Sequence, residues 1–181
     1  MKIVIETYIK TRDDYDFCYS VKKIIKNRIL YNYNSDFKYN FSPIDKVSEY
    51  PITEGMYDYI EGAIVFYVND VKITDWENWD DLVYLWAFLY REVSQSSLLK
   101  RCDHEYADTY GILTFIPLDS GLVDIYYNEE KKASVDRLSL MKAIILEADR
   151  FFQVLWQIRP KLIEDYDWVV EFLEQDKRKF F

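Results

Sequence analysis

His104 is the one histidine of the chain, and so the one imidazole available for acid–base chemistry near neutral pH. Cys102, Asp103, Glu105 and Asp108 stand beside it, and these residue types ligate metals or take part in Cys–His sites. Cys102 and His104 can act together on a strand, where residues two apart share a face, but not on a helix. The surrounding sequence is typical of a loop and favours a histidine in solvent. We therefore predict no catalytic residue and no metal site here.

Motifs for other chemistry are missing from the chain. No G-x-G-x-x-G or Walker-type loop occurs, and four glycines in total leave little from which to build a backbone phosphate site. Serine hydrolase chemistry lacks its G-x-S-x-G turn. The 32 acidic residues contain no pair that stands out for glycoside hydrolysis. We predict no cofactor, and a small enzyme with its site near His104 is kept as an alternative.

Acidic and aromatic residues alternate in one short segment. Its members are Asp75, Trp76, Glu77, Trp79, Asp80 and Asp81. Acids in a first helical turn interact favourably with the helix dipole, which accounts for Asp75 and Glu77 but not for Asp80 and Asp81. Aromatic side chains flanked by carboxylates suit the capture of a basic protein. We predict that these six residues bind a protein partner, and the alternative is that they are only solvated.

The acidic charge is concentrated around that segment. The formal net charge is −9, and residues 45–81 hold 10 acidic and 2 basic side chains, a net charge of −8. Such a charge repels nucleic-acid phosphate, so no direct nucleic-acid contact is expected. A basic run, Lys22, Lys23, Lys26 and Arg28, is interpreted as the solvated face of a helix.

The N-terminal part predicts a strand, a helix and irregular structure. Residues 2–9 form the strand, and apolar residues at helical spacing predict a helix that begins at residue 11 or 13 and ends near Ile29. Residues 31–58 predict irregular structure that holds one short strand at Phe37 to Phe41.

Two hairpins follow from turn chemistry. The β-prone runs Ala63–Val68 and Val71–Thr74 are separated by Asn69-Asp70, two residues that tolerate positive φ. The segment Tyr110–Tyr127 contains Gly121 for a left-handed turn position. We expect both hairpins to lie in one antiparallel sheet.

Three helices are expected to cover that sheet. Thr74-Asp75-Trp76-Glu77 matches a capping box and predicts a helix that ends near Val93. After a charged loop, a long amphipathic helix runs from about Asp136 to Arg159, and Pro160 ends it. A last amphipathic helix carries the apolar residues from Leu162 to Leu173. The predicted fold class is α+β, with an antiparallel sheet built from hairpins and covered by amphipathic helices, in a single globular domain of residues 1–181.

The compartment is predicted from three features. The first six residues lack the pattern of a signal peptide, and the longest apolar run, Leu82 to Tyr90, is about half of a membrane span. The two cysteines, Cys18 and Cys102, do not form a C-x-x-C pair and suit a reducing compartment. We expect a cytoplasmic protein without membrane contact.

In size, acidity, α+β make-up and lack of catalytic motifs, the chain resembles the small acidic immunity proteins that bacteria make in the cytoplasm against secreted toxins, many of which block nucleases. The resemblance implies a non-enzymatic binding protein that neutralises a basic protein partner, as an immunity protein or toxin inhibitor does. Another hypothesis from the same charge is a nucleic-acid mimic that inhibits a DNA-binding protein. The third is the small enzyme near His104.

Overall fold

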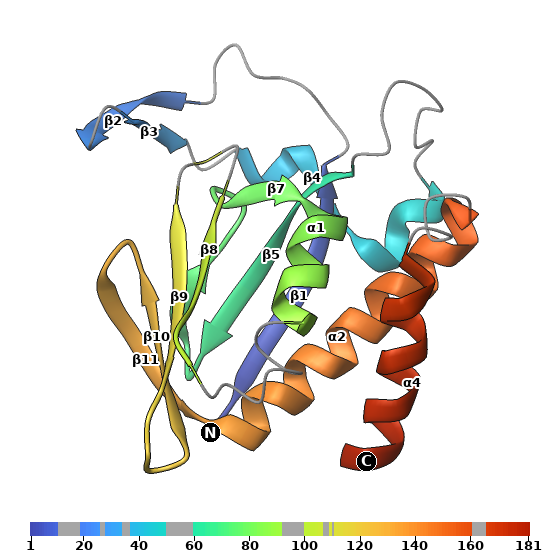
Figure 1. Cartoon of the computed structure of the whole chain (residues 1–181). Coiled ribbons are helices and arrows are strands. Elements are labelled where there is room, and N and C mark those ends of the chain that lie inside the picture. The colour runs from blue at the N-terminus through green and yellow to red at the C-terminus, as the bar shows by residue number, and fades with distance from the viewer. Residues whose placement is uncertain are drawn as a thin grey trace.

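Two antiparallel sheets and a set of helices make up the body of the protein (Figure 1). The structure, a computed structural model, describes residues 1–10, 19–25, 28–33, 37–49, 60–91, 100–106, 109, 111–160 and 166–181. The predicted α+β class is confirmed. The expectation of one sheet was wrong, because the two predicted hairpins belong to different sheets.

Two neighbouring strands, the first and the fifth in chain order, form the centre of the five-stranded sheet. β1 (Ile3–Lys10) lies between β4 (Phe41–Pro43) and β5 (Glu61–Val68), and all pairings are antiparallel. β5 also pairs with β6 (Val71–Thr74) and with β7 (Trp79–Asp81). Alternate side chains of β1 are buried, and this buried face carries Ile5, Thr7 and Ile9. We call it the inner face of the sheet.

The first predicted hairpin is confirmed at its turn. Asn69 and Asp70, between β5 and β6, have φ angles of 47° and 66°, as a two-residue hairpin turn requires. The second hairpin, β9 (Ile112–Pro117) and β10 (Leu122–Tyr127), is also confirmed, and Gly121 has a φ of 82°.

The four-stranded sheet contains two strands that sequence reasoning missed. β8 (Cys102–Glu105) pairs with β9 in the segment that was expected to be a loop around His104. β11 (Glu130–Asp136) pairs with β10 where a charged loop was expected. Alternation of exposed and buried residues in β8 is the signal that a turn-based search overlooks, because four residues are too few to establish a period.

The predicted helix between residue 11 or 13 and Ile29 was wrong. Where the structure describes this region, it forms β2 (Tyr19–Ile25) and β3 (Arg28–Tyr33), an antiparallel pair in a sheet of its own. The segment is rich in β-branched and aromatic residues, which favour strands even where apolar spacing fits a helix.

The strand predicted at Phe37 to Phe41 was displaced. A 3-10 helix occupies Phe37–Asn40, the strand β4 begins at Phe41, and a second 3-10 helix occupies Ile44–Glu49. Residues 31–33 of the predicted irregular segment belong to β3, and residues 34–36 and 50–58 lie outside the described residues.

The predicted capping box was also wrong. The Thr74 hydroxyl donates to the carbonyl of Ile64 at 2.7 Å, which keeps Thr74 in β6. Helix α1 (Leu82–Phe88) begins later, and the carboxylate of Asp81 accepts a hydrogen bond from the Val83 N–H at 2.9 Å. Asp81 is therefore the cap. The predicted end at Val93 falls outside the described residues.

The C-terminal helices follow the predicted pattern more closely. α2 (Arg137–Ile158) begins after its N-cap Asp136, as predicted. The last predicted helix is present as α4, which spans Asp167–Phe180, and its predicted beginning at Leu162 lies outside the described residues. No helix in the described ranges is long and apolar enough to cross a membrane.

The main core lies between the inner face of the five-stranded sheet, the four-stranded sheet, α1 and α2 (Figure 1). Trp86 of α1 donates its indole N–H to the Thr7 hydroxyl at 3.1 Å and stacks on Phe151 of α2 with ring centroids 6.3 Å apart. α4 packs against α2, where Val169 and Leu173 are buried.

Gly62 permits α1 to approach β5. A Cβ at this position would lie 2.3 Å from the Tyr8 carbonyl oxygen and 2.4 Å from Leu82 Cδ1. We expect Gly62→Ala to lower the free energy of unfolding by about 1–3 kcal/mol, the usual cost of overpacking, measured by urea denaturation. Gly121→Asn is the control, because its surroundings are open and Asn tolerates positive φ. Equal unfolding midpoints for the two variants would contradict the close approach.

Candidate functional site

The structure separates the six residues of the predicted partner surface. Asp75, Trp79 and Asp80 are buried, and Trp76, Glu77 and Asp81 are half-buried. Both interpretations, a partner surface and a solvated surface, place the carboxylates of the segment at the surface. The Asp80 side chain is not at the surface, since the residue is only 3% exposed. The idea that Asp80 stands in solvent was wrong. Whether the half-buried members contact a partner stays a prediction.

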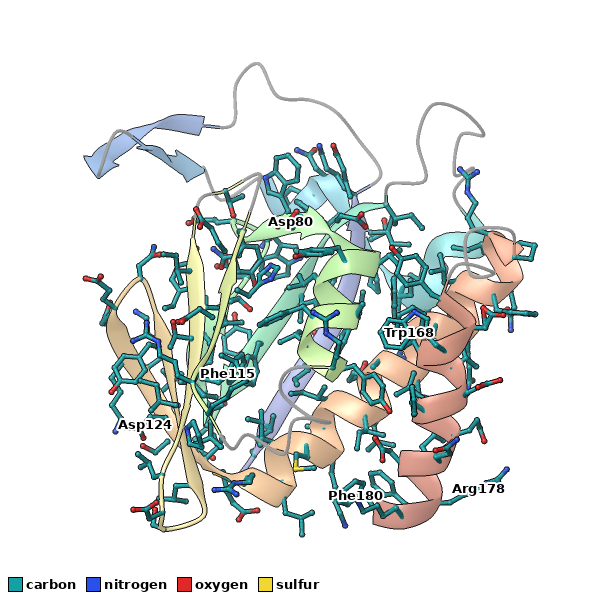
Figure 2. All side chains as sticks on the ribbon, in the orientation of Figure 1. Asp80, Phe115, Asp124, Trp168, Arg178 and Phe180 are labelled. Carbon is teal, nitrogen blue, oxygen red and sulfur yellow. The ribbon has the colours of Figure 1, made fainter. Side chains whose placement is uncertain are left out.

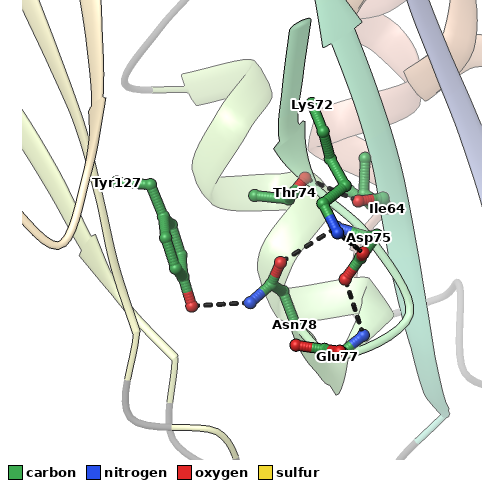
Figure 3. A network of polar contacts seen from close by, with 7 residues as sticks. All are labelled: Ile64, Lys72, Thr74, Asp75, Glu77, Asn78 and Tyr127. Carbon is green, nitrogen blue, oxygen red and sulfur yellow. Dashed lines mark hydrogen bonds and ion pairs between the residues drawn. The ribbon is translucent and has the colours of Figure 1, made fainter. Parts of the chain in front are cut away.

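Asp75 belongs to a polar network that joins the two sheets (Figure 3). Its carboxylate accepts the Glu77 N–H at 2.9 Å and pairs with the Lys72 ammonium group, while its own N–H donates to Asn78 Oδ1 at 2.9 Å. The Asn78 amide then donates to the Tyr127 hydroxyl of β10 at 2.6 Å. This carboxylate therefore stabilises the turn between β6 and β7.

Asp80 faces His104 across the gap between the sheets. The Asp80 carboxylate oxygen Oδ2 lies 3.8 Å from Nε2 of His104 (Asp80 is labelled in Figure 2). His104 is 3% exposed and lies on the buried side of β8. This distance exceeds a hydrogen bond, and Nε2 has no hydrogen-bond partner among the described residues. The expectation of a solvated loop histidine was wrong.

Aromatic rings surround the imidazole. The ring centroids of Phe88, Tyr106 and Tyr84 lie 4.7, 4.9 and 5.9 Å from that of His104. Tyr106 is itself buried, and burial, reinforced by the nearby Tyr127 and Asp80, raises its pKa well above the ordinary value.

His104 and Asp80 make no hydrogen bond through which a proton could pass directly. Cys102 points to the same side of β8, and its thiol donates to the Lys100 carbonyl at 3.4 Å. Within the described ranges, no three His, Cys, Asp or Glu residues are placed to hold a metal. The imidazole is closed to a substrate in this structure, because His104 is 3% exposed.

Trp76 and Trp79 pack on the outer face of the five-stranded sheet. Together with Tyr8, Phe41 and Ala63 they form a second, smaller hydrophobic cluster. The Lys10 ammonium group lies 4.4 Å from the centroid of the Trp79 ring and pairs with the Glu61 carboxylate. Glu61 stands opposite Asp81 in the register of β5 and β7. The predicted partner surface therefore already binds a cation of its own chain, Lys10.

Asp81 has a structural role on this surface. Burial raises the pKa of its carboxyl group, although backbone hydrogen bonds from Val83 and Tyr84 act in the opposite direction. The cap hydrogen bond shows that this carboxylate is bound to the backbone of its own chain.

An open groove lies between α2 and α4. Its volume is about 260 Å³. The lining residues are Asp149, Phe152, Gln153, Trp156 and Gln157 of α2 with Val170, Leu173 and Glu174 of α4. Trp156 is 53% exposed, in contrast to the buried Trp79. Sequence reasoning missed Trp156 because it directly follows Leu155, the last residue of the buried stripe. One residue turns a helix by about 100°, so Trp156 leaves the buried face.

No protein-family model, curated protein or solved structure matches this chain.

The assignment of Asp81 as the helix cap predicts a specific pair of results. We expect Asp81→Ala to lower the free energy of unfolding by about 0.5–2 kcal/mol, because the first turn of α1 loses its acceptor. Asp81→Asn keeps an acceptor oxygen and is expected to change it by a few tenths of a kcal/mol. Urea denaturation of both variants measures this, and equal losses would show that Asp81 acts through its charge.

Proposed function

We propose that this protein is a non-enzymatic acidic binding protein that neutralises a basic protein partner, as an immunity protein or a toxin inhibitor does. The net charge of −9 carries the proposal. Ion pairs such as Lys10–Glu61, Lys72–Asp75 and Arg150–Asp45 remove one charge of each sign, so internal pairing leaves the surplus unchanged. The whole molecule therefore attracts basic proteins over about one Debye length, roughly 8 Å at physiological salt.

A nuclease is a suitable class of target. Enzymes that bind nucleic acid use a basic surface for the phosphates, and an acidic protein that covers this surface blocks access to it. The buried imidazole and carboxylate give the alternative enzyme hypothesis less support, since a catalytic group has to reach its substrate.

The first experiment identifies the partner. The immobilised full chain is incubated with lysate from its host, and bound proteins are identified by mass spectrometry and then purified. Support requires one basic protein whose activity falls to zero at a 1:1 ratio and whose association rate falls steeply with ionic strength. A bound DNA-binding protein without enzymatic activity would favour nucleic-acid mimicry. Failure to enrich any basic protein would contradict both.

Charge-neutralising variants then locate the contact. Glu77→Gln with Asp81→Asn removes two charges from the predicted partner surface, and the new Asn keeps the cap of α1. We expect the association rate to fall about three- to tenfold through loss of steering. Asp70→Asn with Asp119→Asn is the matched control, because both acids are exposed in turns and the charge change is the same. Equal slowing by both double variants would show that only net charge matters.

A further inference from the structure

We propose that the α2–α4 groove binds an amphipathic helix of the basic partner, with an apolar side chain against Trp156 and a lysine or arginine beside the exposed carboxylate of Glu174. This inference rests on the proposed function and adds a contact surface for the same partner, separate from Glu77 and Asp81. It also gives the groove one occupant of defined chemistry.

The size of the groove favours side chains over a small molecule. About 260 Å³ lies below the usual range of small-ligand pockets, which begins near 300 Å³. Its floor is apolar, formed by Phe152, Val170 and Leu173. Gln153, Trp156 and Gln157 recur at three- and four-residue intervals along one edge. Two packed helices present such a floor to a third helix, whose residues at i, i+3 and i+4 enter it.

Trp156 has the properties of an interface anchor. It is 53% exposed and lines the apolar groove. Tryptophan is enriched among the residues that dominate binding energy, because it buries a large area with few rotatable bonds. Covering this side chain removes apolar surface from water.

The charges of the groove select a basic occupant. Among the residues that the structure describes, no lysine or arginine lines it, whereas Asp149 and Glu174 do. Lys177 Nζ lies 2.8 Å from Asp149 Oδ2 and 3.5 Å from Glu174 Oε1, so one ammonium group serves two carboxylates. The hydrogen bond to Asp149 raises the pKa of Lys177, which keeps this internal counterion charged. A second cation from a partner would complete the neutralisation.

A second copy of the chain is a poorer occupant. Each copy carries a net charge of −9, and like charges oppose association. A basic helix has both the apolar stripe and the opposite charge.

The test uses two synthetic peptides of about 18 residues, five helical turns. One is built from Leu and Lys, the other from Leu and Glu in the same apolar pattern. Calorimetry measures their binding to the full-length protein. We expect the Leu–Lys peptide to bind and the Leu–Glu peptide not to bind. Trp156→Ala should weaken binding at least tenfold. Trp168→Ala is the matched control, because Trp168 is 37% exposed on α4 outside the groove lining and should change affinity less than twofold (Figure 2).

A second pair of variants tests the charges. Lys177→Gln removes the ammonium group from both carboxylates, although Asp149 keeps its hydrogen bond from Gln153 at 2.9 Å, and should tighten Leu–Lys binding about threefold or more. Lys179→Gln removes the same charge from an exposed position outside the groove and should have a smaller effect. Circular dichroism and urea denaturation confirm that each variant is folded.

Several outcomes would overturn the inference. Equal weakening by Trp156→Ala and Trp168→Ala would place the peptide elsewhere, and equal binding of the Leu–Glu peptide would remove the charge selection. A dimer that Trp156→Ala dissociates would assign the groove to a second copy. In each case a basic partner captured from lysate and inhibited 1:1 would still support the proposed function. If no basic partner is captured from lysate but the groove still binds the Leu–Lys peptide, the proposed function is contradicted and the groove remains a peptide site.

Discussion

The contact of the Trp86 indole with β1 and α2 connects the layers of this structure. The indole is fully buried, donates a hydrogen bond to Thr7, and stacks on Phe151. A buried indole N–H without a partner is costly, so this hydrogen bond restricts how α1 rests on the sheet. The position of α1 in turn determines where its cap, Asp81, and the preceding strand, β7, lie. On its other side α2 is free to pack against α4 and form the groove.

Local hydrogen bonds compete with interface formation for the same carboxylates. Asp75 closes a turn, Asp81 caps a helix and Asp80 accepts the N–H of Asp81 at 2.8 Å. A carboxylate bound in this way has exchanged its water shell for protein donors, and its removal affects folding before it affects binding. Acids crowded in sequence therefore do not form one acidic patch.

Charge and shape act over different ranges in the proposed function. The net charge of −9 acts at a distance and raises the encounter rate with basic proteins. Affinity needs contact area, which the groove offers through Trp156 and the apolar floor beneath it. Lys177 influences both charge and contact, because in the free protein it neutralises part of the acidic charge of the groove.

The sequence by itself determined the features that depend on neighbouring residues. Asn69-Asp70 and Gly121 specify turns because few residues adopt positive φ, and Asp136 specifies a helix start because its side chain reaches the next turn. The long apolar stripe of α2 likewise indicates a helix with one buried face. Tertiary structure decided the rest. Thr74 and Asp81 both offer oxygens near a helix start, and only the pairing of β6 with β5 takes Thr74 out of competition. His104 lies in a strand because β9 supplies its hydrogen bonds, and a partner strand some ten residues away leaves no trace in four residues of sequence. The groove is decided in the same way, since its two walls come from helices whose contact no local pattern encodes.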